Sequence, residues 1–468
     1  MPNFLATFSL AAFPLLVIGL FLLYRPPVAT ALSLLVSEMF LPPLYSLPLS
    51  SPTWLDKDTI PAIATFLVAS LVARSSLRRS RPFRGIERFY IVMFVAAFMT
   101  MWTNRDPLRY GPTIVQGEVF SDFTSDTIRT VAASWMAFHL GRALFKTSRD
   151  LVSLCRLLAL AGVIYSIPCL FEIRFSPVLL SKVYGYFNSH PFGMSVRWGG
   201  YRPTVFFDNG LQLTMFMLVC LVAALGLTRA RKRLGVLPMT GVCLYLLAVL
   251  VLCKSTGAII YAIIIVPLLT MASPRTVLKV CVVVTSFFVL YPLLRFADVI
   301  PTKAIGDYFT SMSADRAQSL SYRFDMEQGM LDLTRLRPLF GWGGYGRNMV
   351  WDPRSGHTIT VVDGMVIATL SVRGLVGFFA YFGPFIVSVI RACRLNKRIK
   401  DRSSRVMLTA LTLAGSVILF DLIINATTPP IFILLFGALY GLPSGIIAEQ
   451  EAAAARAFEP VALEAAPA

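Results

Sequence analysis

The feature that most constrains this chain is a repeated apolar run of about 20 residues, the length of helix that crosses a hydrocarbon core roughly 30 Å thick. Phe4–Tyr24, Val205–Leu227 and Val277–Leu294 are examples. Strands of a membrane barrel are shorter and alternate apolar with polar residues. With 56% hydrophobic and 15% charged residues, the sequence predicts an all-α polytopic membrane protein. By this helix length it has about 12 or 13 transmembrane helices.

Much of the positive charge of the chain falls in five clusters between apolar runs. In a soluble protein the formal net charge of +18 would favour a nucleic-acid partner. Short Lys/Arg-rich loops of membrane proteins instead stay in the cytoplasm, so we expect all five clusters on one face and no nucleic-acid partner. The clusters are Arg74, Arg78, Arg79, Arg81, Arg84 and Arg88; Arg142, Lys146 and Arg149; Arg229, Arg231, Lys232 and Arg233; Arg275 and Lys279; and the run 391–405.

The chain is predicted to cross the membrane twice between successive clusters, so every cluster returns to the cytoplasmic face. The pairs are 88–103 with 126–145, 151–172 with 205–228, 236–253 with 256–271, and 276–296 with 365–390. Residues 1–295 then hold transmembrane helices with outer loops at 104–124 and 173–204. A large outer, periplasmic loop at 296–364, C-terminal transmembrane helices at 365–448 and a cytoplasmic tail at 449–468 follow. The segment Val28–Leu49 either spans the membrane or lies in its interface.

Polar chemistry is expected in the outer loops, because helices facing lipid carry little of it. The loop 173–204 mixes aromatic side chains with Lys182, His190, Arg197 and Arg202. An interfacial belt accounts for most of the aromatics. We single out Arg202, which directly precedes Pro203 and the next span.

The loop 296–364 is predicted to contain a helix from Ser313 to about Arg335, which stops before Pro338. On this helix Arg323 either pairs with Glu327 at i+4 or binds an anion. The glycine-rich turn Gly341–Gly346 either cradles a phosphate through backbone N–H groups or is a tight turn that needs positive φ.

Metal ligands are sparse in the sequence. Asp56 and Asp58, before a predicted span, either hold Mg²⁺ or Mn²⁺ or form an ordinary helix start. His139, His190 and His357 lie in three separate regions, so no zinc spacing exists. We expect no metal and no other cofactor. The seven cysteines lie in apolar runs or a cytoplasmic loop, and no outer-loop disulfide is expected.

The order of elements between Tyr322 and Phe379 resembles a known family. An arginine-bearing helix (Ser-Tyr-Arg323-Phe-Asp-Met) precedes Arg337-Pro-Leu-Phe-Gly-Trp-Gly-Gly-Tyr-Gly346, and a span with Gly374-Leu-Val-Gly377 follows. This order resembles the C-terminal signature of the O-antigen ligase and O-antigen polymerase family of bacterial polysaccharide enzymes. Tyr201–Asn209 resembles the family's arginine-containing entry to a mid-chain span, and Lys254-Ser-Thr-Gly257 its Ser-Arg-Gly hairpin with the basic residue displaced.

The segment before Gly374 departs from the family pattern. The family places His-Asn, or in polymerase branches Asp-Asn, shortly before its Gly-Leu-Ile-Gly element. This chain has Asp363-Gly364 there and His357 earlier. Either residue is a candidate for the general base, and the departure favours the polymerase branch over the ligase branch.

The resemblance implies transfer of a glycan from undecaprenyl diphosphate to an acceptor hydroxyl, without metal and with inversion at the anomeric carbon. Arginine forks neutralise phosphate oxygens, so we expect Arg202 and Arg323 to bind the diphosphate, with Lys254 and Arg337 as auxiliaries. Asp363 or His357 then takes the proton of the acceptor.

The same resemblance implies a GT-C-like fold in the bacterial inner membrane. The expected partners are the lipid-linked donor, an acceptor glycan or lipid, membrane lipids, and polysaccharide export or chain-length machinery. Two alternatives stay open. One is a transporter or flippase of lipid-linked oligosaccharide, and the other is a metal-dependent GT-C glycosyltransferase that uses Asp56 and Asp58.

Overall fold

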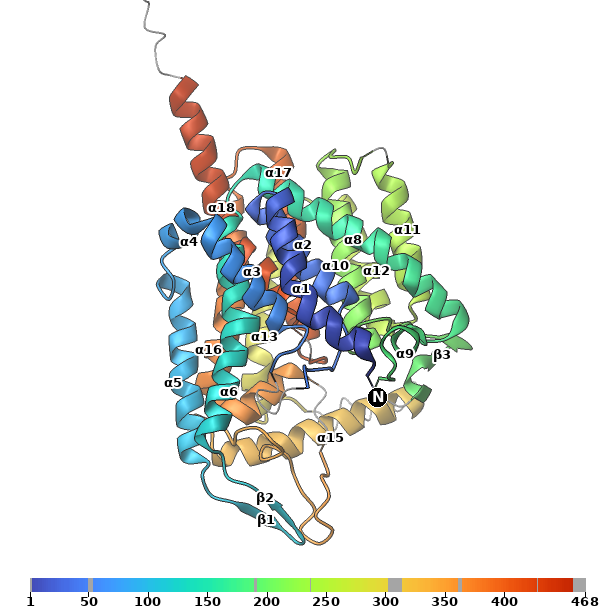
Figure 1. Ribbon diagram of the computed structural model, residues 1–468, viewed down its shortest axis with the longest axis vertical. Coiled ribbons are helices and arrows are strands. Elements are labelled where there is room, and N and C mark those ends of the chain that lie inside the picture. The colour runs from blue at the N-terminus through green and yellow to red at the C-terminus, as the bar shows by residue number, and fades with distance from the viewer. Residues whose placement is uncertain are drawn as a thin grey trace, which may run out of the picture.

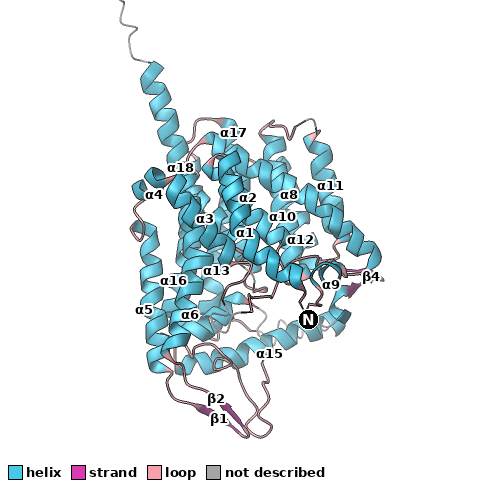
Figure 2. Ribbon diagram, in the orientation of Figure 1, coloured by secondary structure: helices cyan, strands magenta, loops and turns pink. Residues whose placement is uncertain are grey.

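The computed structural model describes residues 2–48, 54–188, 192–235, 237–301, 314–360, 364–426 and 428–457, the side chains of 314–323 and 457 excepted. It is a bundle of helices with two small hairpins (Figures 1 and 2). The hairpins pair β1 (Leu108–Tyr110) with β2 (Thr113–Val115) and β3 (Val196–Arg197) with β4 (Gly200–Tyr201), both antiparallel.

The helices follow the predicted spans closely. In chain order they are α1 (Phe4–Leu23), α2 (Pro26–Phe40), α3 (Thr59–Val72), α4 (Arg74–Arg79), the 3₁₀ turn η1 (Gly85–Glu87), α5 (Arg88–Thr103), α6 (Phe120–Thr130), the π-helix η2 (Val131–Met136), α7 (Ala137–Leu144), α8 (Ser148–Phe175), α9 (Leu179–Tyr184), the 3₁₀ turn η3 (Phe192–Ser195), α10 (Gly210–Arg229), α11 (Met239–Leu252), α12 (Thr256–Met271), α13 (Pro274–Phe296), α15 (Ala314–Leu336), α16 (Met365–Asn396), α17 (Arg402–Asp421) and α18 (Pro430–Ala457).

Eight helical stretches in the described residues are long and apolar enough to cross a membrane, which makes the chain an all-α polytopic membrane protein. They are α1, η1 with α5, α8, α10, α13, α16, α17 and α18. The apolar helices α2, α3, α11 and α12 are shorter, and α6, η2 and α7 follow one another without a break. A total of about 12 or 13 spans stays a prediction, because these shorter helices fall below the usual spanning length.

The helix α10 forms the centre of the bundle. It is apolar on all sides, and 94% of its most apolar stretch is buried. Such a helix is stable only when other helices surround it, and α8, α11, α12 and α17 do so. The helix α2 is also internal, with nine of its fifteen residues buried against α1, α3 and α8. It is therefore a packed helix and not a segment lying flat in the interface.

The basic clusters meet at one end of the bundle. Arg142 donates to the carbonyls of Ser80 and Arg81, and Arg156 donates to the carbonyl of Arg233 at 3.0 Å. Figure 1 shows α4 and the loop before α17 at this end, with the β1–β2 hairpin and α15 at the opposite end. The sequence prediction that the clusters share a face is confirmed for the described residues. We call the opposite face the outer end.

The predicted helix of the large loop is α15, which lies across the outer end (Figure 1). It ends at Leu336, one residue beyond the prediction, and its predicted cap Ser313 lies outside the described residues. The buried Arg295 of α13 donates to the carbonyl of Phe324 at 3.2 Å and pairs with Glu327 at 3.5 Å. Tyr291 also donates to Glu327, at 2.8 Å. Glu327 thus ties α15 to α13.

The helix α16 is broken at Gly374, where φ is 64° and ψ is −171°. The segment 338–343 runs beside the break and pairs with it. The N–H groups of Leu375 and Val376 donate to the carbonyls of Pro338 and Leu339, at 2.8 and 3.1 Å. In a membrane protein such a break is tolerated only where neighbouring protein satisfies the freed backbone groups.

We predict that Gly374→Ala lowers the free energy of unfolding by about 1–3 kcal/mol, the usual cost of a strained backbone conformation. A methyl group at this position would lie 2.3 Å from the Leu339 backbone. Gly19→Ala is the matched control, because nothing lies within 4 Å of its added methyl group. The measurement is thermal unfolding of both purified variants. Equal unfolding midpoints would contradict the need for glycine at the break.

Candidate functional site

Two adjoining cavities open around the break in α16. The inner cavity has a volume of about 440 Å³ and the outer cavity about 210 Å³. Both are lined by Asp126, Arg129, Val372 and Arg373. The inner cavity adds apolar residues such as Met365, Ala368 and Ile433 and the polar residues Asp58, Thr130, Ser134, Asp208, Gln212, Thr369, Tyr381 and Thr428. The outer cavity adds Trp54, Thr100, Glu118, Asp122, Phe123 and Tyr345, among others.

Arg373 lies at the junction of the two cavities, directly before the break. Its Nη2 donates to Asp126 Oδ1 of α6 at 2.5 Å, and its guanidinium lies 5.9 Å from the centre of the Tyr381 ring. Its Nη1 is buried and has no hydrogen-bond partner among the described residues. Thr369 lies one turn earlier on the same face of α16. The break thus presents guanidinium and hydroxyl groups to the cavities.

Carboxylates line the opposite wall of the inner cavity. The buried Lys57 holds one of them in place, with Nζ 3.4 Å from Asp208 and 3.6 Å from Glu38. Glu38 also accepts from Gln212 at 2.9 Å. The Asp58 carboxylate makes no hydrogen bond or salt bridge with the described residues. Burial together with the nearby Asp56 carboxylate raises its pKa well above the ordinary value. A carboxylate with a raised pKa is suited to accept a proton near neutral pH.

Asp56 has the role of a helix start. Its Oδ1 accepts from the N–H groups of Asp58 and Thr59 at 3.0 and 3.1 Å, at the beginning of α3. Its Oδ2 pairs with Arg129 at 3.1 Å. In the described residues, no group of three or more His, Cys, Asp and Glu side chains is arranged to hold a metal ion.

Arg202 and Lys254 both lie beside the β3–β4 hairpin, Arg202 directly after β4 and Lys254 in the turn between α11 and α12. Lys254 packs its ammonium against Gly200 in β4, where an added methyl group would lie 2.0 Å from Nζ. Arg202 follows two residues later, with Cδ against Gly210 at the start of α10. Burial and the nearby Arg197 lower the pKa of Arg202, and its buried Nε has no hydrogen-bond partner. Neither cation forms a salt bridge within the described part of the chain.

Two other predicted diphosphate ligands are placed differently. Arg337 donates to the carbonyl of Thr103 and to Asn104 Oδ1, both at 2.5 Å, and stacks on Trp342. It therefore fastens the outer loops and does not line either cavity. Arg323 belongs to α15, but its side chain lies outside the described residues.

Of the two predicted general bases, the structure describes only His357. His357 is exposed, and its backbone carbonyl accepts from the N–H of Asp352 in the loop beside the β1–β2 hairpin. It lines neither cavity. Asp363 lies outside the described residues, whereas Met365, two residues later, lines the inner cavity.

The glycine-rich turn uses its backbone N–H groups internally. Those of Gly341, Trp342 and Gly343 donate to carbonyls of Arg337, Ser371 and Val372. The N–H of Gly344 donates to Glu118 Oε1 at 2.7 Å. These four groups are not open to a phosphate, and the positive φ at Gly341, Gly343 and Gly346 fits the tight-turn alternative.

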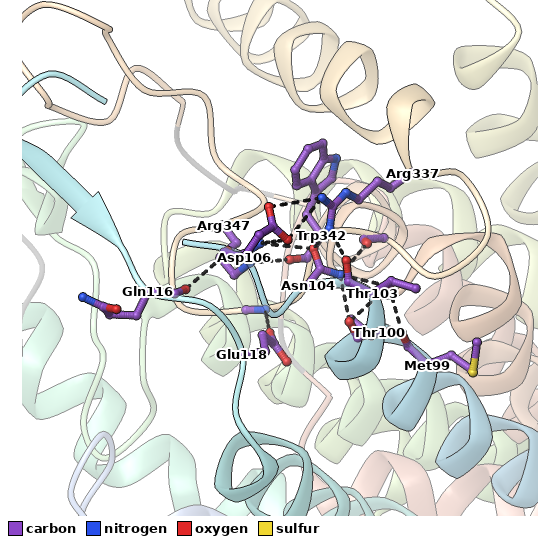
Figure 3. A network of polar contacts seen from close by, with 12 residues as sticks. Met99, Thr100, Thr103, Asn104, Asp106, Gln116, Glu118, Arg337, Trp342 and Arg347 are labelled. Carbon is purple, nitrogen blue, oxygen red and sulfur yellow. Dashed lines mark hydrogen bonds and ion pairs between the residues drawn. The ribbon is translucent and has the colours of Figure 1, made fainter. Parts of the chain in front are cut away.

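Arg347, which the sequence reasoning missed, fastens this turn to the first outer loop (Figure 3). It is fully buried, and its guanidinium donates to the carbonyls of Asp106, Gln116 and Trp342 at 2.7, 3.0 and 3.2 Å. Asp106 Oδ1 lies 3.6 Å away. This network holds 104–118 against the segment that satisfies the break in α16.

Sequence reasoning also missed Asp126, Arg129 and Arg373. A usable signal was present, because each is an ionisable residue in or beside an apolar span, and such residues commonly mark functional sites. Nothing in the sequence showed that α6 and α16 place them around one space.

We predict that Arg347→Gln lowers the free energy of unfolding by about 3–5 kcal/mol, because it removes one partner from a buried ionic network. The carbonyls of Asp106 and Gln116 would lose their donors. Thermal unfolding and limited proteolysis of the 104–118 loop measure the effect. Arg354→Gln is the control, since that side chain is exposed and makes no hydrogen bond within the described residues. Unchanged proteolysis of the Arg347 variant would show that the network does not hold this loop.

Comparison with known proteins did not yield a family: no family model matches the chain, and no significant match to a curated protein was found.

Proposed function

We propose that the chain transfers a glycan from an undecaprenyl diphosphate donor to the hydroxyl group of an acceptor sugar at the outer end. The observation that carries the proposal is a pair of uncompensated cations beside a cavity lined with carboxylates. Arg202 contacts Gly210, and Asp208, two residues earlier, lines the inner cavity. A diphosphate at Arg202 and Lys254 would place the sugar it carries near Asp208 and Asp58.

The chemistry suits these groups. The acceptor oxygen forms a bond to the anomeric carbon, and the bond from that carbon to the diphosphate oxygen breaks. The leaving diphosphate takes the bonding electrons, and guanidinium and ammonium groups stabilise its charge. The acceptor's proton passes to a carboxylate. Asp58 joins Asp363 and His357 as a candidate for this base, because it lines the cavity and has a raised pKa.

We also propose that the chain is a member of the O-antigen polymerase and ligase family, that its fold is GT-C-like, and that it lies in the bacterial inner membrane. The support for this proposal is the order of motifs in the sequence together with the position of Arg202 and Lys254 beside the β3–β4 hairpin. Polysaccharide export or chain-length proteins are the partners that such a polymerase would use.

A transporter of lipid-linked oligosaccharide is the second candidate, because broken helices are common at transporter binding sites. The charged groups inside the bundle argue against it. Glu172 accepts from the N–H groups of Leu179, Thr204 and Val205, and His139 pairs with Glu87 at 2.7 Å. Charges held in this way fasten loops and helices together and do not form a path along which protons or ions could pass.

We predict that Arg202→Gln lowers glycan transfer by about 100-fold, the usual effect of removing one donor that stabilises developing charge. The assay incubates the purified protein with an undecaprenyl diphosphate oligosaccharide. A polymerase gives a ladder of products, a ligase gives one capped product, and a transporter leaves the donor unchanged. Arg109→Gln is the control, since this exposed arginine lies in the distant β1–β2 hairpin. Full activity of the Arg202 variant, or loss of activity in EDTA, would contradict this mechanism.

We predict that transfer falls with decreasing pH as Asp58 becomes protonated, because only the carboxylate form accepts a proton. The midpoint should lie above the ordinary value for aspartate, in the direction of the raised pKa. Asp58→Asn should lower the rate by about 100-fold or more and abolish this dependence. The same pH profile measured on His357→Gln is the comparison. If that variant loses the pH dependence instead, His357 is the base.

A further inference from the structure

We propose that the joined cavities at the break of α16 bind a phosphate-free sugar unit, with Thr369 and Arg373 as specificity-determining contacts. The biological meaning of this site, as the place of a donor or acceptor sugar, rests on the proposed function. The binding itself does not.

The charge of the cavities disfavours a phosphate. Their two arginines are already paired, Arg373 with Asp126 at 2.5 Å and Arg129 with Asp56 at 3.1 Å. Further carboxylates line the same space, namely Asp58 and Asp208 in the inner cavity and Glu118 and Asp122 in the outer cavity. A phosphate would have to displace a carboxylate from each arginine and would meet the rest. A neutral sugar instead donates its hydroxyl hydrogens to carboxylates and accepts from guanidinium groups.

Two residues of α16 that line this space each have a polar group without a hydrogen-bond partner among the described residues. Thr369 is 8% exposed, lines the inner cavity and makes no hydrogen bond within the described residues. Arg373 Nη1 is likewise buried and unpaired there. Buried polar groups without partners are rare in native proteins, since each loses its hydrogen bonds to water. The two groups lie one helical turn apart, so one ligand can satisfy both.

The shape of the space fits a sugar ring. A volume of about 440 Å³ lies within the range of small-molecule sites, which combine apolar walls with a few fixed polar groups. The Tyr381 ring forms part of the wall, and its hydroxyl is held by Thr428 at 2.9 Å. Trp54 and Tyr345 add aromatic surface in the outer cavity. Aromatic faces match the C–H face of a sugar, whereas the carboxylates match its hydroxyl edge.

The test is saturation-transfer NMR on the full chain in nanodiscs free of glycolipid and sugar-based detergent. The probes are free galactose, rhamnose and N-acetylglucosamine, with glucuronate as the anionic comparison. We expect saturation of at least one neutral sugar and weaker saturation of glucuronate. Thr369→Val should weaken the affinity by about tenfold, as the loss of one hydrogen bond does, and Thr369→Ser should restore it.

The matched control is Thr285→Val, because Thr285 is a buried threonine without a hydrogen-bond partner that lines neither cavity. Inorganic pyrophosphate, followed by phosphorus NMR, probes the Arg202 and Lys254 site in the same nanodiscs. Absence of saturation by every neutral sugar, equal affinity of wild type and Thr369→Val, or loss of sugar signal on adding pyrophosphate to Arg202→Gln would overturn the sugar site. Sugar binding without pyrophosphate binding or transfer would support the sugar site and contradict the proposed transferase.

Discussion

The structure depends on the rule that no backbone polar group may remain unpaired inside a membrane protein. At Gly374 the helix α16 is interrupted, so backbone groups on both sides lose their partners within the helix. The segment 338–343 forms hydrogen bonds with these groups on both sides of the break. That segment is the start of the glycine-rich turn. The turn therefore serves the backbone of a transmembrane helix, and the outer loops are built around this need.

The interior charges of the bundle follow a related logic. A buried ion is costly unless other groups surround it with compensating contacts, and here each such ion fastens two segments distant in sequence. Lys57 joins the start of α3 to α2 and to the loop before α10. Arg347 joins the glycine-rich turn to the first outer loop. Arg202 and Lys254 differ from these two residues, because neither forms a salt bridge within the described part of the chain.

The candidate site was partly visible in the sequence. Arg202 and Lys254 were predicted to act together, and the structure places both beside the β3–β4 hairpin, Arg202 directly after it and Lys254 in contact with Gly200. Arg337, in the separate motif Arg337–Gly346, was also predicted as an auxiliary ligand, yet it stacks on Trp342 and holds a loop. Sequence motifs identify which residue types surround a site, but they do not show which of the arginines in these motifs faces it. That choice depends on packing between loops more than 200 residues apart.

The sequence by itself determined the fold class, the approximate bounds of the apolar helices and the gathering of basic clusters at one end. These follow from local hydrophobicity and from the even number of predicted spans between successive basic clusters. Neither requires knowledge of which helices pack against one another. Tertiary structure decided where the cavities lie, because Asp58, Asp126 and Arg373 come from three helices or loops that meet only in the folded bundle. It also decided that α16 breaks, since a glycine in an apolar run continues as helix unless another segment is present to pair with the interrupted backbone.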